Sequence, residues 1–84
     1  MAVSQFDQFL HDATIIDPDS EGTLGRDPLY GLYISWCTVT HARPRGEKSF
    51  WRGIQQRIDA DHNSLRMTGP AAADYYLSSY PTLV

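Results

Sequence analysis

The sequence has few of the features that stabilise a very small protein, such as disulfides and zinc sites, or that anchor a protein in a membrane. Its 84 residues include one cysteine, Cys37, which excludes an intramolecular disulfide and a cysteine-based zinc site. No stretch of 18 consecutive apolar residues occurs, so we expect no membrane contact. The first residues lack the basic and apolar segments of a signal peptide. Together with the single cysteine, this predicts a protein of the reducing cytoplasm.

Residues suited to catalysis or metal binding are also sparse. The three histidines, His11, His41 and His62, lie far apart and lack the spacing of converging metal ligands. Cys37 is four residues from His41, but it falls on an apolar helix face, which favours a buried hydrophobe over a nucleophile. Few chains this short build both a core and a pocket. We therefore expect no metal, no cofactor and no enzymatic activity.

What the chain does contain is enough apolar material for one domain. Hydrophobic residues make up 42% of the sequence and aromatic residues 12%, which is typical of a globular protein. The length favours a single domain over residues 1–84.

Charge is unevenly distributed along the chain. The net charge of −3 divides into −5 over residues 1–40, +3 over residues 41–66 and −1 over residues 67–84. Six of the seven basic residues lie between Arg43 and Arg66. Such asymmetry favours an anionic partner, although a solvated basic face without a partner remains open.

Hydrophobic spacing predicts three helices, at 4–13, 28–40 and 46–58, and a last helix that begins at Pro70. We expect Ser4 to cap the first helix and Asp27 to cap the second, with Pro28 at its first position. Residues 64–68 alternate like a strand, and residues 23–25 could form another. Residues 14–16 could continue the first helix or begin an extended segment.

The second and third helices have different faces. The second has a wide apolar stripe made of Leu29, Leu32, Tyr33, Trp36 and Cys37. In the third, one sector is apolar, comprising Phe50, Trp51, Ile54 and Ile58. The opposite sector carries cations and hydrogen-bonding side chains, and its only acid is Glu47 near the helix start. The sector comprises Lys48, Ser49, Arg52, Gln55 and Gln56. Gly31, inside the second helix, would allow a neighbouring element to pack closely.

Two helices joined by a basic turn and followed by a strand are typical of a helix-turn-helix with a small wing. The sequence therefore predicts a mainly α fold, a winged helix-turn-helix with a three-helix core, a small β-wing and an extra C-terminal helix. In double-stranded DNA, Arg52 would suit guanine, and Gln55 or Gln56 would suit adenine. Ser49 could bind a base or a phosphate, and the remaining cations would bind phosphates, namely Arg43, Arg45, Lys48 and Arg66. A plain helical bundle with a solvated third helix is the alternative.

One resemblance sharpens this prediction. The run from Leu29 to Cys37 (LYGLYISWC), then Pro44, then Ser49-Phe50-Trp51 with Ile54, is similar to the winged-helix DNA-binding domain at the C-terminus of phage and plasmid primase–helicases, the poxvirus-primase-like group. The resemblance covers about residues 3–68 and implies a DNA-binding accessory domain, or a small protein of a mobile element. It places on the recognition helix Lys48, Ser49, Arg52 and Gln56. Roles in replication, excision or transcriptional control all remain open.

The chain departs from that family in two places. The family often ends in a basic wing rich in arginine and glycine, whereas here only Arg66 remains, and a helix from Pro70 is added. These departures keep a second hypothesis open, a protein-interaction or dimerisation domain without DNA binding. Its contact would use Tyr30, Ile34 or the C-terminal helix with Tyr75.

Overall fold

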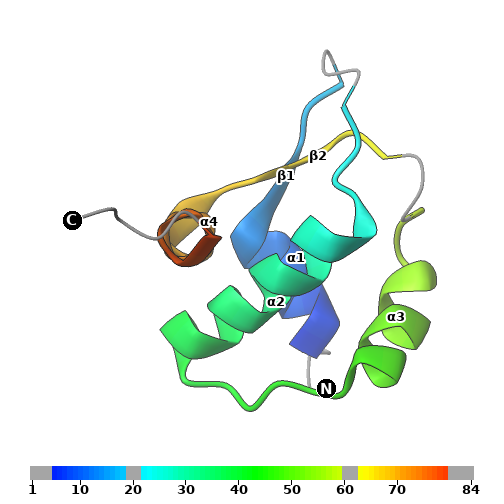
Figure 1. The fold of residues 1–84 in the computed structure, drawn as a ribbon. Coiled ribbons are helices and arrows are strands. Elements are labelled where there is room, and N and C mark those ends of the chain that lie inside the picture. The colour runs from blue at the N-terminus through cyan, green and yellow to red at the C-terminus, as the bar shows by residue number, and fades with distance from the viewer. Residues whose placement is uncertain (1–4, 19–21, 60–62, 80–84) are drawn as a thin grey trace.

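The computed structural model describes residues 5–18, 22–59 and 63–79, and these form a mainly helical fold with one small sheet. The order along the chain is α1 (Gln5–Ala13), β1 (Thr14–Ile16), α2 (Arg26–Thr40), α3 (Glu47–Gln55), β2 (Leu65–Met67) and α4 (Gly69–Ser79) (Figure 1). Figure 1 shows α3 and α4 on opposite sides of the α1–α2 pair. The prediction of a mainly α fold is confirmed. Ser4, the expected cap of α1, lies outside the described residues.

The sheet joins the two halves of the chain. β1 and β2 pair antiparallel, with Ile15 opposite Arg66. Backbone N–H groups of Asp17 and Thr68 extend the ladder at both ends, each donating to a carbonyl at 2.8 Å. The β-branched run at 14–16 therefore begins a strand and does not continue α1, in keeping with its stiff side chains.

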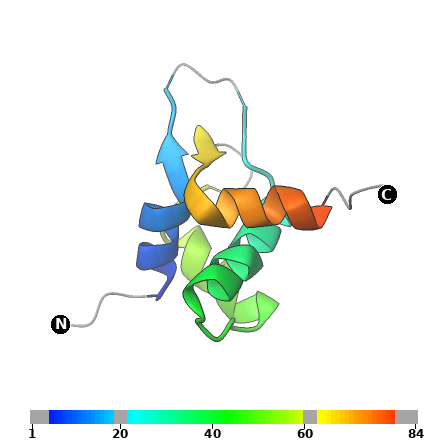
Figure 2. The same cartoon turned by 90° about the vertical axis from the view of Figure 1, so that its left-hand side faces the viewer.

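β2 pairs with a strand that precedes α2, and in the described part of the chain no further strand follows it. α4 comes directly after β2 instead (Figure 2). The β-hairpin expected for a small wing is thus not found among the described residues. Gly69, with φ of +77°, makes the left-handed turn that directs the chain from β2 into α4.

Residues 23–25, expected as a possible strand, are not a strand. The side chain of Asn63 takes the place of a strand partner. Its Oδ1 accepts the backbone N–H of Leu24 at 3.0 Å and that of Leu65 at 3.2 Å, while its Nδ2 donates to the Leu24 carbonyl at 3.3 Å. One amide therefore connects the segment before α2 to β2, because an asparagine side chain can donate and accept as a peptide group does.

Aromatic rings fill the core where α1, α2 and α3 meet. Phe9, Tyr33 and Phe50 are fully buried. The ring centroids of Phe9 and Tyr33 are 5.4 Å apart, and those of Tyr33 and Phe50 are 4.6 Å apart. Such tilted pairs contribute beyond their buried area. The apolar stripe predicted for α2 is buried throughout: Leu29, Leu32, Tyr33, Trp36 and Cys37.

Two glycines permit close approach between helices. A Cβ at Gly31 would lie 2.6 Å from the ring of Tyr75, and one at Gly53 would lie 2.3 Å from the ring of Phe6. Both distances are below van der Waals contact, so a side chain at either position would push α4 from α2 or α1 from α3. The expectation that Gly31 accommodates a neighbour is confirmed, and that neighbour is α4, which runs across α2 (Figure 2).

Some predicted helix boundaries are wrong. α2 begins at Arg26, with Gly25 at the N-cap, so Asp27 lies in the first turn and is not the cap. Pro28 is then the third helical residue, where no intrahelical donor is needed. α3 covers 47–55 and not 46–58, so Ile58 lies beyond its end and is only partly buried.

Candidate nucleic-acid interface

α3 presents the side chains that its spacing predicts. Phe50 and Ile54 are fully buried and fix the helix on the core. The outward residues are all exposed, with Gln56 immediately after the helix: Lys48, Ser49, Arg52, Gln55 and Gln56. Gly46 caps the helix, and its carbonyl accepts the N–H of Phe50 at 2.9 Å.

The basic turn between α2 and α3 begins with a tight reversal. His41 adopts φ of 59° and ψ of 31°, in the left-handed region, and the N–H of Ala42 donates to the Cys37 carbonyl at 2.8 Å. A left-handed residue after a helix satisfies its last carbonyls and ends it. The chain is thereby turned toward α3.

A buried hydroxyl holds this turn in place. The N–H of Arg45 donates to Tyr33 Oη at 2.8 Å, Tyr33 Oη donates to Gln5 Oε1 at 2.6 Å, and Gln5 Nε2 donates to the Arg43 carbonyl at 3.1 Å. Burial raises the pKa of Tyr33 to about 12, so the hydroxyl keeps its proton at neutral pH. The backbone of the turn is fixed while the side chains of Arg43 and Arg45 remain exposed.

The basic residues of the 43–66 window fall into two groups. Arg57 forms an ion pair with Asp7 of α1, and Arg66 forms one with Asp17 at 3.0 Å. The other group makes no ion pair within residues 5–18, 22–59 and 63–79, and it comprises Arg43, Arg45, Lys48 and Arg52. These four, on α3 and the turn before it, keep their charge available to solvent.

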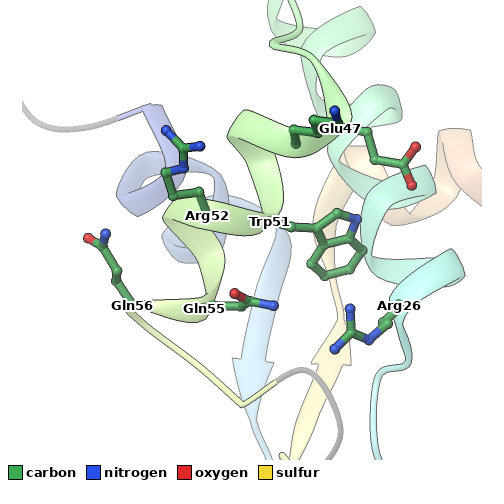
Figure 3. Close-up of a pocket in the computed structure, with 7 residues that line it drawn as sticks. Arg26, Glu47, Trp51, Arg52, Gln55 and Gln56 are labelled. Atoms are coloured by element: carbon green, nitrogen blue, oxygen red, sulfur yellow. The ribbon is translucent and has the colours of Figure 1, made fainter.

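An open cavity of about 670 Å³ lies beside α3, between that helix and the start of α2. We call it the Trp51 cavity, and it is lined by Arg26, Glu47, Lys48, Trp51, Arg52, Gln55 and Gln56. The guanidinium carbon of Arg26 is 5.4 Å from the centroid of the Trp51 ring. In Figure 3, Gln55 points toward Arg26 and Trp51, whereas Arg52 and Gln56 point to the other side of α3.

The structure does not bring Arg66 into this cavity. Arg66 lies on β2 and lines a different cavity with Ile15, Thr23 and Tyr76, of about 360 Å³. Of the eight residues expected to contact DNA, seven therefore lie on α3, at its end or in the turn before it, and Arg66 lies elsewhere on the surface.

The residues expected to form a protein contact differ in their exposure. Tyr30 and Ile34 are partly buried against the core, and the Tyr30 ring is 5.1 Å from that of Phe50. Tyr75 packs on Gly31. Among the described residues, the most exposed large apolar side chains are Ile16, at 75%, and Leu77 of α4, the C-terminal helix, at 73%.

Sequence reasoning missed two members of the site. Arg26 lies in the acidic segment 1–40, away from the basic window, and its contact with α3 depends on how α2 and α3 pack. Trp51 was assigned to the buried stripe, yet it is only partly buried. Its position beside Phe50 gave one signal, because adjacent helical residues are turned by about 100° from each other, so one of the two lies toward the edge of a narrow buried face.

Cys37 is buried, and its burial raises the pKa of the thiol. In the described ranges, no group of three histidine, cysteine, aspartate or glutamate side chains converges as metal ligands would. None of the helices described is long and apolar enough to cross a membrane. His62 lies outside the described residues.

The surface made by α3 and the preceding turn thus offers four cations, two glutamine amides and a serine hydroxyl on a rigid support. Such a surface can bind phosphates and donate to or accept from base edges. Comparison with protein-family models, with curated proteins and with solved structures found no match.

Proposed function

We propose that this chain binds double-stranded DNA by placing α3 in the major groove. The observation that carries the proposal is that, within the described part of the chain, some basic residues form ion pairs and others do not. Arg57 and Arg66 are paired with carboxylates, whereas Arg43, Arg45, Lys48 and Arg52 surround the exposed side of α3 without such partners among the described residues. Glu47 in the first turn of α3 offsets one of these charges, and the remaining excess of positive charge favours a polyanion.

The dimensions of α3 suit this role. α3 is nine residues long, and an α-helix with its side chains is about 10–12 Å across, which fits the major groove of about 12 Å. Arg52 is our choice for guanine, and Gln55 or Gln56 for adenine. Arg43, Arg45, Lys48 and Ser49 would contact phosphates at the rim. Arg66 is the weakest member of the set, because a phosphate must compete with Asp17 for its guanidinium.

We regard the fold as a variant of the winged helix in which α4 stands where the wing would be. Support comes from the order of elements, with β1 between the first two helices and paired to the strand that follows α3. In the resembling family, this domain accompanies a primase–helicase. The corresponding role here is an accessory DNA-binding one, in replication or regulation of a phage, plasmid or other mobile element, without catalysis and in the cytoplasm.

A titration of fluorescein-labelled duplex DNA, followed by anisotropy, tests this function. We expect saturable binding at low salt and an affinity that falls as salt rises. With three cations at phosphates, namely Arg43, Arg45 and Lys48, the slope of log K against log salt is about −3. Affinity that is independent of salt, or no binding at low salt, would overturn the proposal.

A second candidate function is a protein contact through α4. Tyr76 is 51% exposed and Leu77 is 73% exposed, and both follow the segment that packs on α2. Exposed apolar side chains side by side on one helix favour a partner. Sedimentation velocity tests for a homodimer, and Leu77→Lys would abolish any self-association that uses this face.

A further inference from the structure

The Trp51 cavity has a feature that groove binding by α3 does not use, namely a flat aromatic surface. The Trp51 indole comes from the middle of α3, and the Arg26 guanidinium from the first residue of α2 lies over it at 5.4 Å. The indole is only partly buried and lines a cavity of about 670 Å³ (Figure 3). That volume is within the range of about 300–1,000 Å³ typical of small-molecule sites.

The lining of the cavity has the chemistry of a nucleobase site. Bases stack on indole rings and on guanidinium planes. Two stacking contacts of about 3.5 Å each need about 7 Å, more than the 5.4 Å between Arg26 and Trp51. A base on the indole therefore requires the exposed Arg26 side chain to move outward, where its guanidinium can cover the other face of the base. Gln55 points toward both and carries a donor and an acceptor, as the edge of a base requires. Lys48 at the margin supplies positive charge for a flanking phosphate.

A base inside a regular duplex cannot use this surface. Stacked bases expose only their edges in the grooves, so the face of a base reaches an aromatic ring only after the base has left the stack. The cost of unstacking is smallest for a base that has no pairing partner. An aromatic surface next to a helix suited to the groove therefore matches a duplex that carries one unpaired nucleotide.

We propose that the Trp51 cavity binds an unpaired nucleobase, so that the preferred target is double-stranded DNA with an extrahelical nucleotide next to the segment bound by α3. This inference rests on the proposed function, since α3 must first hold the duplex. It goes beyond that function by assigning to Trp51, Arg26 and Gln55 a role in choosing the structure of the DNA.

The test uses the full chain and two fluorescein-labelled duplexes that differ only by one unpaired adenine. Base–aromatic stacking of about 1–3 kcal/mol predicts that the bulged duplex binds roughly 5- to 150-fold more tightly at the same salt concentration. Trp51→Leu, which keeps apolar bulk but removes the ring, is expected to abolish this preference. Arg43→Ala is the matched control and should weaken both duplexes by the same factor, because Arg43 is exposed in the turn before α3, does not line the Trp51 cavity and would contact only a phosphate.

Circular dichroism establishes that each variant is folded. If Trp51→Leu does not fold, Gln55→Ala replaces it, because Gln55 is exposed and its truncation leaves the core intact. Gln55→Ala is then expected to reduce the preference for the bulged duplex severalfold. Equal affinity of the native chain for the two duplexes would overturn this inference and leave the proposed function standing. Failure to bind either duplex at low salt would overturn the proposed function, and the inference with it.

Discussion

The hydroxyl of Tyr33, on a fully buried ring in α2, accepts a hydrogen bond from the backbone N–H of Arg45 at 2.8 Å. The same hydroxyl donates to Gln5 Oε1 at 2.6 Å. One side chain of the core thus fixes α1, α2 and the basic turn relative to one another. The hydrogen bond to Arg45 fixes the turn directly before α3, and with it the position at which α3 begins.

Removing that hydroxyl should therefore affect both stability and binding. Tyr33→Phe keeps the ring but leaves the N–H of Arg45 and the side chain of Gln5 without this partner. We expect a loss of about 1–3 kcal/mol in the free energy of unfolding, measured by urea denaturation. Tyr30→Phe provides a control, because Tyr30 lies on the same helix and no hydrogen bond to its hydroxyl is seen in the described structure. Equal stability of the two variants would contradict this role of Tyr33.

A second prediction concerns the contact between α1 and α3. A Cβ at Gly53 would lie 2.3 Å from the Phe6 ring, which cannot retreat into a packed core. Gly53→Ala gains roughly 1 kcal/mol of helix propensity but forces overpacking that costs about 1–3 kcal/mol. We expect net destabilisation, seen as a lower Tm by circular dichroism.

Gly46→Ser is the control for Gly53→Ala. Nothing lies within 4 Å of a Cβ built at Gly46, and serine is at least as favourable as glycine at an N-cap, so we expect no loss of stability. A Gly53→Ala variant that melts at or above the native Tm would show that α1 and α3 can separate without cost.

The helical parts of the fold could be predicted from the sequence because their apolar spacing is regular. Phe50 and Ile54 had to point inward, and Lys48 and Arg52 therefore pointed outward. The strand pairing of 14–16 with 65–67 could not be predicted in the same way. It depends on a contact between segments about 50 residues apart, which no local pattern records.

The site was only partly predictable for a similar reason. Spacing along one helix identified the residues of α3 but not Arg26, which reaches Trp51 from the start of α2. The number of basic residues gave no indication that Arg57 and Arg66 are paired with Asp7 and Asp17. Whether a cation forms an ion pair depends on tertiary packing. Counting the basic residues in the sequence therefore overestimates the positive charge that is available to bind an anion.

A third prediction follows from the ion pair between α1 and the end of α3. The hydrogen bond from Arg57 lowers the pKa of Asp7 below its usual value. A carboxyl with a lowered pKa in the folded state stabilises the fold above its unfolded pKa of about 3.9. This stabilisation is lost as the pH falls through the lower, folded value.

Asp7→Asn tests this dependence. The difference in Tm between the native chain and the variant should be largest at neutral pH and shrink as the pH falls below about 4. Salt should reduce the difference at neutral pH, because the pair is exposed to solvent. A difference in Tm that stays constant from pH 7 to pH 2.5 would mean that the carboxylate charge of Asp7 contributes nothing.

The last prediction separates two arginines that differ in their surroundings. Arg52 is exposed on α3 and has no carboxylate partner among the described residues, whereas Arg66 is held by Asp17. If α3 enters the major groove, Arg52→Ala removes a base contact and weakens binding of duplex DNA by about 1–3 kcal/mol. Arg66→Ala removes a cation of the same type that is already neutralised, so its effect on affinity should be the smaller of the two. Anisotropy titrations of both variants against the same duplex give the comparison. A larger loss for Arg66→Ala would move the DNA-binding surface from α3 to β2, since both changes remove one guanidinium from an exposed position.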